Sequence, residues 1–464
     1  MSRLLKERLK TVCIILLVIS GLLQVGILWS YQNQGTPTSF LRRLFGGSAP
    51  ISATEARDKL FIPDRLILIS GGVSHWLIDK KSSFYDDLWD EVREGLDRIV
   101  SGSAGLKASN EEWGDVAERK GFIIDFGYEV SPELLEWFVS GTSLGKQDLP
   151  SVRKVKVEPD ILDENYSTFY ICSTSNRVYV SAPIRHERKM GLDKVTETVK
   201  DDKDQKYRDY STLRSAKQDK VMGASPDALF VSASPAYWPY YQYGCDPPAG
   251  AEAREELMEA VLGTEKDRYN TSKSSDNTVF TYGDNIYRYY NDGYLTYSYL
   301  GGVDASGNSV TDPLLNAYKF VVRVKTLLEP TADIILRSVE RLQSGVYRFG
   351  FDYRLEGMPV QVDMYEQDGR SLKHAIVIQA DSKRVLKCDW LLRDFTENGK
   401  SEYNDRFIDI SNRADLIKEE LKIEDLSSGY WIKSSDDRLL KPMLLMDMKD
   451  GLPLRIEMLP KEGD

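Results

Sequence analysis

The sequence predicts an α+β protein in which an N-terminal transmembrane helix precedes about three extracytoplasmic domains of mixed antiparallel sheet and helix. Three observations lead to this prediction. An uncharged apolar run, residues 12–29, follows a basic N-terminus. The length of 464 residues suits about three domains of ordinary size. Helical and strand-like segments then follow one another without the regular βαβ rhythm of a parallel sheet.

The charge balance excludes one large class of partner. Acidic side chains outnumber basic ones by 72 to 61, which makes the net charge −11. This is the wrong sign for a protein that follows a phosphate backbone, so we expect no nucleic-acid partner. Residues 1–11 carry four basic side chains and one acidic one, so this stub has a charge of +3 and the remainder −14.

Residues 1–11 are predicted to be a cytoplasmic basic stub, and residues 12–31 a transmembrane anchor. Eighteen helical residues extend about 27 Å, close to the hydrocarbon thickness of a bilayer. Trp29 and Tyr31 lie at the far end, where aromatic rings favour the headgroups. The basic flank places the N-terminus in the cytoplasm and the rest of the chain outside the cell membrane. A cleaved signal peptide is the alternative, but the run ends in large residues rather than the small ones that cleavage requires.

A polar pattern follows one face of the predicted anchor. Five residues at three- and four-residue spacing share this face: Cys13, Leu17, Ser20, Gln24 and Leu28. The amide of Gln24 is costly in hydrocarbon unless it finds a hydrogen-bond partner. We therefore expect this face to dock on another transmembrane helix, and the alternative is a monomeric anchor that tolerates the glutamine.

The chain beyond the anchor is predicted to contain a linker and three domains. Residues 32–60 are polar and form the juxtamembrane linker, in which the basic-aromatic patch at 40–45 suits either the outer membrane surface or a plain linker helix. The strongly charged stretch 187–222 predicts a solvated helix pair or a connector. The expected boundaries are an N-terminal extracytoplasmic domain at 61–215, a central α+β domain at 216–312 and a C-terminal α+β domain at 313–464.

The first extracytoplasmic domain mixes helices with strands. A strand at 65–70 opens it, and an amphipathic helix is expected at about 82–100 because apolar residues recur there every three or four positions. Ser131 and Pro132 are the residue types that are typical of a helix N-cap and of the first helical position. The other expected elements are a helix near 110–120, a strand at 121–128, and β-rich stretches at 152–157 and 168–181, the second broken at 175–176.

Two hairpins stand out in the rest of the chain. Asp292-Gly293 supplies the turn between strands 286–290 and 294–299, and Glu356-Gly357 the turn between 346–355 and 360–365. The tyrosines of the first hairpin suit either cross-strand packing, which is the commoner role, or a sugar- or peptide-binding surface. The other expectations are helices at 251–262, 314–328, 332–342 and 414–421, and strands at 229–234, 375–379, 385–391, 439–448 and 453–458.

The search for catalytic chemistry mostly excludes candidates. Gly141–Gly145 matches the G-x-S-x-G pattern, but a helix rather than a strand precedes it, which favours a helix end at Gly141 over a nucleophile at Ser143. The histidines are widely separated, and a structural role is expected for them. The histidines are His75, His186 and His374, and the expected exterior cysteines are Cys172, Cys245 and Cys388.

Metal and cofactor patterns are missing from the sequence. The exterior cysteines are odd in number and far apart, so they indicate no disulfide framework, and none forms a C-x-x-C pair of the kind that binds zinc. The sequence contains no P-loop, no G-x-G-x-x-G motif and no calcium or zinc motif. We therefore expect no cofactor, no metal and no catalytic residue.

Several segments together resemble a known family. They are the basic N-terminus with its single anchor and the stretches 63–65, 70–72, 84–89, 290–297 and 353–360. In these features the chain is similar to the YycH family, the membrane-anchored accessory proteins of the WalK/WalR (YycG/YycF) two-component system of low-GC Gram-positive bacteria. The resemblance extends over nearly the whole chain.

The resemblance implies a fold, partners and a role. It implies three extracytoplasmic α+β domains, the last two of which resemble the smaller sister protein YycI. It also implies a complex with a sensor histidine kinase and a YycI-like single-pass protein, in contact through transmembrane helices and membrane lipid. Such a protein tunes kinase activity and cell-wall turnover and is no enzyme. Two alternatives remain open: an extracytoplasmic ligand- or cell-wall-binding module, and a membrane-anchored hydrolase.

Overall fold

The description rests on a computed structural model of the chain. It describes residues 51–71, 74–141, 149–173, 175–186, 191–201, 207–215, 225, 227–231, 237–248, 269–303, 307, 309–325, 332–366, 368–413, 422–449 and 452–461. Residues 53–464 form one compact unit, distinct from residues 1–52. Among the helices of the described residues, none is both long and apolar enough to cross a bilayer. The expected anchor at 12–31 and the expected helices at 251–262 and 414–421 lie outside the described residues.

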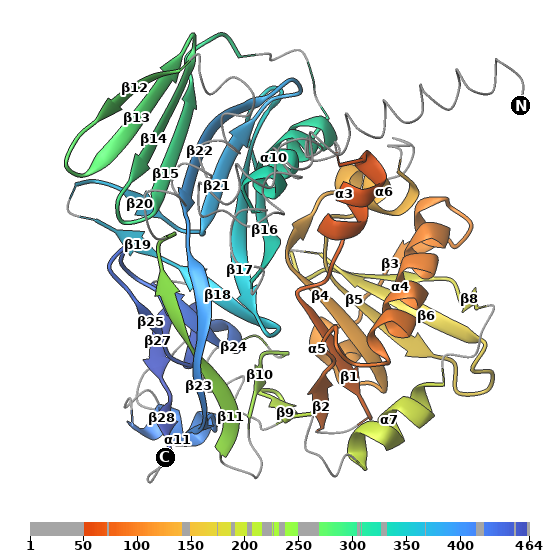
Figure 1. Ribbon diagram of the computed structural model, residues 1–464. Helices are drawn as coiled ribbons and strands as arrows, with labels where there is room; N and C mark the ends of the chain where they lie inside the picture. The colour runs from red at the N-terminus through yellow and green to blue at the C-terminus, as the bar shows by residue number, and fades with distance from the viewer. Residues whose placement is uncertain are drawn as a thin grey trace, which may run out of the picture. The chain divides into compact units, whose positions relative to one another are not determined.

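The first half of the compact unit is built on an antiparallel sheet of ten strands, here called the N-terminal sheet (Figure 1). Its strand order is β10-β9-β2-β1-β4-β5-β6-β7-β3, and β8 pairs with β6. The strands are β1 (Arg65–Ile69), β2 (His75–Leu77), β3 (Leu106–Ala108), β4 (Gly121–Val130), β5 (Val152–Pro159), β6 (Tyr166–Cys172), β7 (Val178–Ser181), β8 (Ile184–Arg185), β9 (Asp209–Thr212) and β10 (Leu229–Phe230).

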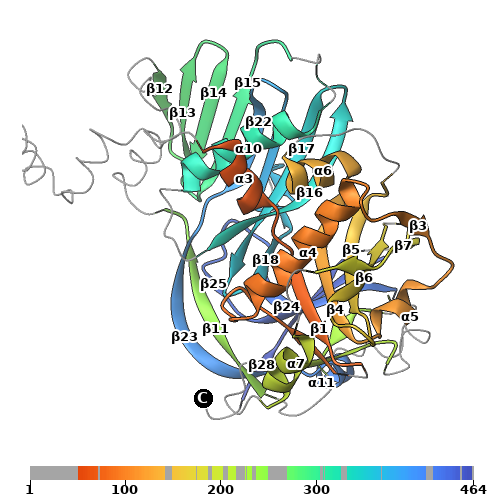
Figure 2. The same ribbon diagram turned by 90° about the vertical axis from the view of Figure 1, so that its right-hand side faces the viewer.

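Helices cover both faces of the N-terminal sheet. The helices of this half are α3 (Ala53–Leu60), α4 (Tyr85–Val100), α5 (Trp113–Ala117), α6 (Pro132–Ser140) and α7 (Leu192–Lys200). On one face α3, α4 and α6 gather, as Figure 2 shows, and Phe61 stacks there on Phe126 and Phe138 with ring centroids 5.6 and 4.8 Å apart. On the other face Trp113 of α5 packs with Ile67 and Ile123.

The second half contains a larger sheet of twelve strands, here called the large sheet, and a four-stranded sheet. The large sheet has the order β12-β13-β14-β15-β22-β21-β17-β18-β24-β26-β27, and β16 pairs with β17. Its strands are β12 (Asn270–Lys273), β13 (Asn277–Tyr282), β14 (Asn285–Tyr290), β15 (Tyr294–Tyr299), β16 (Asp333–Gln343), β17 (Val346–Leu355), β18 (Met358–Val362), β21 (Ile376–Ala380), β22 (Val385–Leu391), β24 (Ile423–Ile432), β26 (Met443–Met448) and β27 (Leu454–Glu457).

The remaining elements complete the core of the second half. Helix α10 (Thr311–Lys325) buries Leu314, Phe320 and Val321, and Phe320 stacks on Tyr297 of the large sheet at 5.9 Å. A second core cluster lies between β24 and β26 and the four-stranded sheet, and includes Tyr240 and Leu426. The other elements are β11 (Tyr237–Asp246), β23 (Asp394–Asn404), β25 (Leu439–Leu440) and β28 (Leu459–Pro460) of the four-stranded sheet, the pair β19 (Met364–Tyr365) and β20 (Ser371–Leu372), and α11 (Phe407–Arg413).

The mixed α+β class and most local expectations are confirmed. The turn at Gly293 has a φ of 87°, and the turn of the second hairpin has positive φ at both Glu356 and Gly357, 48° and 81°. Ser131 caps α6 by accepting from the backbone N–H of Leu134, and Gly141 ends that helix in the left-handed conformation. The domain boundaries drawn from the sequence stay predictions.

One expected helix is wrong, and several strands were missed, among them β11, β23 and β24. Residues 333–343 form strand β16, which pairs along its length with β17. A short apolar run such as Ile334-Ile335-Leu336 suits either structure, and the pairing with β17 decides it. The aromatic run 237–243 is part of strand β11, paired with β23. The charged stretch 187–222 contains helix α7 and strand β9 in its described part.

Candidate functional site

The N-terminal sheet meets the large sheet through a chain of eight buried or nearly buried charges, here called the charged junction. Four members are acidic and four are basic, so the charges balance. They come from the start of the N-terminal sheet, from its strands β1, β4 and β5, from the turn before β10, and from β16, β17 and β24 of the large sheet. The members are Asp64, Arg65, Asp125, Lys154, Asp227, Arg337, Arg354 and Asp425.

Asp64 forms one end of the charged junction. Its Oδ2 lies 2.7 Å from Nη1 of Arg337, and its Oδ1 accepts a hydrogen bond from Nη2 of Arg354. The same Nη2 also donates to the backbone carbonyl of Asp64 at 3.0 Å. Burial by itself would raise the pKa of the Asp64 carboxyl, but Arg337, Arg354 and Arg65 outweigh it and hold that pKa well below its usual range. Asp64 is therefore a permanent anion between two arginines of the large sheet.

A glycine makes room for this ion pair. Gly127 lies at an irregular position of β4, with a φ of 71°. A Cβ at this position would lie 2.5 Å from Nη1 of Arg337 and 3.0 Å from Cβ of Asp64. Any other residue would therefore be strained in its backbone and would also displace the guanidinium.

Arg65 occupies the centre of the charged junction and connects two acids from different sheets. Its Nη2 donates to Oδ2 of Asp125 at 3.0 Å and to Oδ2 of Asp425 at 2.6 Å, and its Nη1 donates to the carbonyl of Leu426 at 3.2 Å. Burial raises the pKa of Asp425, Arg65 opposes this rise, and the neighbouring Asp125 adds to it. Asp425 shares the guanidinium of Arg65 with Asp125, so its charge is less well compensated than that of Asp64, which lies against two guanidinium groups.

Lys154 and Asp227 form the other end. Nζ of Lys154 donates to Oδ2 of Asp227, which also accepts from Nε1 of Trp113 at 2.8 Å, while Oδ1 accepts from Ser225 at 2.9 Å. Burial would raise the pKa of Asp227, but Lys154 and these donors hold it well below its usual range. Because the hydrogen bonds of Asp227 are satisfied, the Lys154–Asp227 pair is a rigid neighbour of the Arg65 cluster.

The charged junction joins the N-terminal sheet to the large sheet, and its acidic and basic groups are paired with one another. Its acids are neutralised by arginine and lysine, and among the described residues no group of three or more His, Cys, Asp or Glu side chains is arranged to hold a metal. Charged contacts between layers require exact partners, because a displaced buried charge loses its compensation. The arrangement therefore favours one relative position of the two sheets over all others.

Two histidines form serine–histidine–acid groupings that the sequence did not reveal. Ser338 Oγ lies 3.1 Å from Nε2 of His374, whose Nδ1 lies 3.0 Å from Oδ2 of Asp352. Asp352 Oδ1 accepts from the backbone N–H of Ala375 at 2.8 Å. The three residues lie 14 to 36 positions apart on β16, β17 and the segment before β21, so no local motif could indicate them.

The structure favours a packing role for this grouping. A Cβ at Gly350 would lie 2.3 Å from both the His374 ring and Ser338 Oγ, so the glycine creates the space that the ring fills. Ser338 is in the middle of strand β16, opposite Gly350, rather than on a sharp turn that would expose a nucleophile. His374 thereby ties edge strand β16 to β17.

The second grouping is closed to substrate. Ser167 Oγ is hydrogen-bonded to Nε2 of His186, and the Glu91 carboxylate lies against Nδ1. Ser167 is fully buried and His186 is 3% exposed, so no substrate reaches the hydroxyl. His75 is buried too, on β2, which agrees with the structural role expected for it.

Cys172, Cys245 and Cys388 are free and buried. Burial raises the pKa of Cys172 and of Cys245 to about 12 each, and it raises the pKa of Cys388 well above its usual value. Such thiols stay protonated and act as small apolar side chains. The tyrosines of the first hairpin are likewise mostly in the core, and Tyr287 and Tyr297 pack with ring centroids 4.5 Å apart, which supports the packing interpretation.

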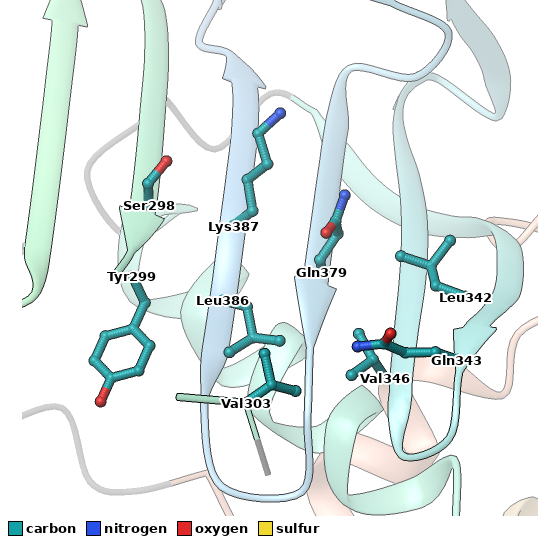
Figure 3. A pocket seen from close by; sticks show the side chains of 9 residues that line it. All are labelled: Ser298, Tyr299, Val303, Leu342, Gln343, Val346, Gln379, Leu386 and Lys387. Atoms are coloured by element: carbon teal, nitrogen blue, oxygen red, sulfur yellow. The ribbon is translucent and has the colours of Figure 1, made fainter. Parts of the chain in front are cut away.

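A groove of about 420 Å³ lies on the large sheet (Figure 3). Its apolar lining comes from Val303, Leu342, Val346 and Leu386, and its polar lining from Ser298, Tyr299, Gln343, Gln379 and Lys387. Gln379 and Lys387 are paired neighbours on β21 and β22. The lining contains no carboxylate, histidine or thiol, so Ser298, Tyr299 and Lys387 have no carboxylate or histidine beside them in the groove to act as a general base.

The comparison with solved structures decides the fold. No family model and no curated protein matches the chain. A crystal structure of YycH from Bacillus subtilis superposes with a TM-score of 0.55, covering 86% of this chain and 96% of that one. The chain has a YycH-like fold. The sequence identity of the two is 10%, so the likeness extends to architecture and carries over no individual residue.

The YycH-like fold does not test the site that the sequence predicts. Cys13, Leu17, Ser20, Gln24 and Leu28 lie outside the described residues, so the helix-docking face stays a prediction. Ser143 lies outside them as well, while Gly141 before it ends α6 as expected. The charged junction was missed, although Pro63-Asp64-Arg65 was among the segments that carried the family resemblance.

Proposed function

We propose that the chain is a non-enzymatic, single-pass regulator of the cell membrane that binds a WalK-like sensor histidine kinase together with a YycI-like protein. In this role it tunes kinase activity in cell-wall homeostasis. The observation that carries the proposal is the YycH-like fold, which extends over 86% of the chain. The motifs that resemble the YycH family support it independently of the structure.

The proposed mechanism is a shift of the kinase between its conformational states. A regulator changes such an equilibrium only to the extent that it binds one state more tightly, and couplings of about 1–3 kcal/mol are typical. The anchor would supply this difference through interhelical hydrogen bonds and packing, in which Gln24 is the proposed polar contact. The cytoplasmic stub at 1–11 and the exterior body then lie on opposite sides of the membrane.

The test uses the anchor by itself and a matched pair of variants. Residues 1–45 expressed without the body should still regulate the kinase in cells that lack the full chain. In the full chain, Gln24→Leu should weaken co-purification with the kinase complex, whereas Val25→Leu, which changes no polar group, should leave it intact. An unchanged complex with Gln24→Leu would dismiss the helix contact.

A binding module is the second candidate, and the groove on the large sheet favours it. In that role the domains beyond the anchor would bind a ligand in the groove, and the anchor would transmit the bound state across the membrane. Residues 1–45 would then be inactive, and Lys387→Glu would abolish the response of the full chain to its ligand. The hydrolase alternative would require ester or muropeptide hydrolysis that disappears with Ser143→Ala or Ser338→Ala.

A further inference from the structure

The hairpin loop between β5 and β6 carries two adjacent apolar side chains that bury nothing. Ile161 is 95% exposed and Leu162 is 96% exposed, the two highest values among the large exposed hydrophobic side chains of the described residues. Single exposed apolar residues are common on protein surfaces and need no explanation. Two neighbours that project completely from one loop tip are a different case, because neither contributes to the core of this chain.

The loop is held in a defined shape by its polar residues. Oδ1 of Asp160 accepts from the backbone N–H of Leu162 at 2.7 Å and of Asp163 at 3.2 Å. Oδ1 of Asp163 accepts from both the backbone and the side-chain nitrogen of Asn165, at 3.0 and 2.6 Å. The backbone closes the hairpin, since Asp160 N–H donates to the carbonyl of Tyr166 at 2.8 Å, and Tyr166 N–H forms a turn by donating to the carbonyl of Asp163 at 2.9 Å.

These hydrogen bonds form the turn without any contribution from the side chains of Ile161 and Leu162. Turns favour Gly, Asn, Asp and Ser, and the two aspartates already supply the turn chemistry. Nothing in the loop requires a branched apolar side chain at either tip position. Because the loop is ordered beforehand, little conformational entropy would be lost when a partner covers the tip.

The charges around the tip select the kind of partner. Asp160, Asp163 and Glu164 are exposed beside it, and within the described residues no lysine or arginine pairs with them. Three carboxylates disfavour an anionic lipid surface, and in a chain of net charge −11 they also disfavour a second copy. They suit a protein surface in which lysines or arginines surround an apolar socket.

We propose that the Ile161–Leu162 tip inserts into an apolar socket with a basic rim on the extracytoplasmic part of a protein partner. The inference rests on the proposed function for the identity of that partner, the sensor kinase or its YycI-like companion. The contact would be separate from the helix contact in the membrane. Full burial of an isoleucine or leucine strengthens binding on the order of 10- to 100-fold each.

The first experiment locates the contact in living cells. A photo-crosslinking amino acid is placed at Leu162 in the full chain, with the same probe at exposed Lys107 on β3 as the control. We expect a crosslink from position 162 to the kinase or to the companion, and none from position 107. A crosslink to another copy of the chain, a crosslink to lipid, or no crosslink above the control would overturn the proposal.

The second experiment measures the apolar and the charged parts separately, using the full chain and the co-expressed kinase complex in nanodiscs. Ile161→Asp with Leu162→Asp should weaken binding by at least about 100-fold, whereas Ile161→Val with Leu162→Met should bind like the parent. Replacing the three acids by their amides keeps every Oδ1 acceptor of the loop, and should slow association and reduce its salt dependence. Equal affinities for the Asp and the Val/Met variants would overturn the proposal.

The two proposals fail in distinguishable ways. If the parent chain binds the kinase complex and the Ile161→Asp/Leu162→Asp variant binds it equally well, the tip is not a contact and the proposed function stands. If the parent chain does not bind the kinase complex, the proposed function fails, and the choice of partner fails with it. Circular dichroism of the Asp variant should match the parent, because neither side chain is part of the core.

Discussion

Replacing Asp64 with asparagine tests the charged junction most directly. The substitution keeps the shape of the side chain and removes the charge that pairs with both Arg337 and Arg354. Removing one partner of a buried ion pair typically costs about 3–5 kcal/mol, because the remaining charge stays buried without compensation. The retained bond from Arg354 to the backbone carbonyl of residue 64 places the expected loss near the lower end, about 3 kcal/mol.

The assay is urea unfolding of the full chain in detergent together with hydrogen exchange of β1 and β16. We expect Asp64→Asn to lower the unfolding free energy by about 3 kcal/mol and to speed exchange at β1 and β16 before the rest of the chain opens. The control is Asp436→Asn, which removes the same charge from a side chain that is 89% exposed, and it should change stability by less than about 0.5 kcal/mol.

The pH dependence follows from the same pair. Because the pKa of Asp64 is lower in the folded chain, its contribution is complete above the unfolded value near 3.9 and is lost as the pH falls below it. Asp64→Asn should therefore be closest to the parent in strong acid and furthest from it at neutral pH. A loss below about 1 kcal/mol at pH 7, or one that does not shrink in acid, would refute the reasoning.

Two further predictions concern other parts of the charged junction. Gly127→Ala should lower the unfolding free energy by about 1–3 kcal/mol, because the φ of 71° strains an alanine and the added Cβ would displace Arg337. The control is Gly105→Ala, where an added Cβ has no neighbour within 4 Å, and it should lower the unfolding free energy by less than about 1 kcal/mol. Equal losses for the two variants in urea unfolding would contradict the packing argument. Asp425→Asn should cost about 1 kcal/mol or less at pH 7, because burial raises the pKa of that carboxyl above its unfolded value, so that ionising it makes the folded chain less stable as the pH rises. Arg65 also keeps Asp125 as a partner in this variant. A loss as large as that of Asp64→Asn in urea unfolding would contradict this reasoning.

Local chemistry predicted the local structure well. The cap at Ser131, the left-handed end at Gly141 and the turns at Gly293 and Glu356-Gly357 are properties of a few adjacent residues, and all are present. The helix expected at 332–342 failed because its apolar run suits two structures. The partner strand β17, which follows it along the chain, favours the extended one.

The candidate sites divide in the same way. The docking face of the anchor is a periodicity within one segment, so the sequence alone could propose it. The charged junction and the grouping of Ser338, His374 and Asp352 could not be proposed, because their members come from different segments that meet only in the folded chain. Asp64 and Arg337, for example, are 273 positions apart and meet only when the two sheets pack.

The sequence by itself determined the division of the chain into a basic stub, an apolar run and an acidic body, together with the α+β class and most turns. These depend on composition and on residues within a few positions of each other, where steric preference and periodicity act directly. Only the tertiary structure decided that β16 is a strand, that four acids and four bases compensate each other between two sheets, and that Ile161 and Leu162 face solvent. The physical reason is that ion pairing, strand pairing and burial depend on distances in space, which the order of residues along the chain does not specify.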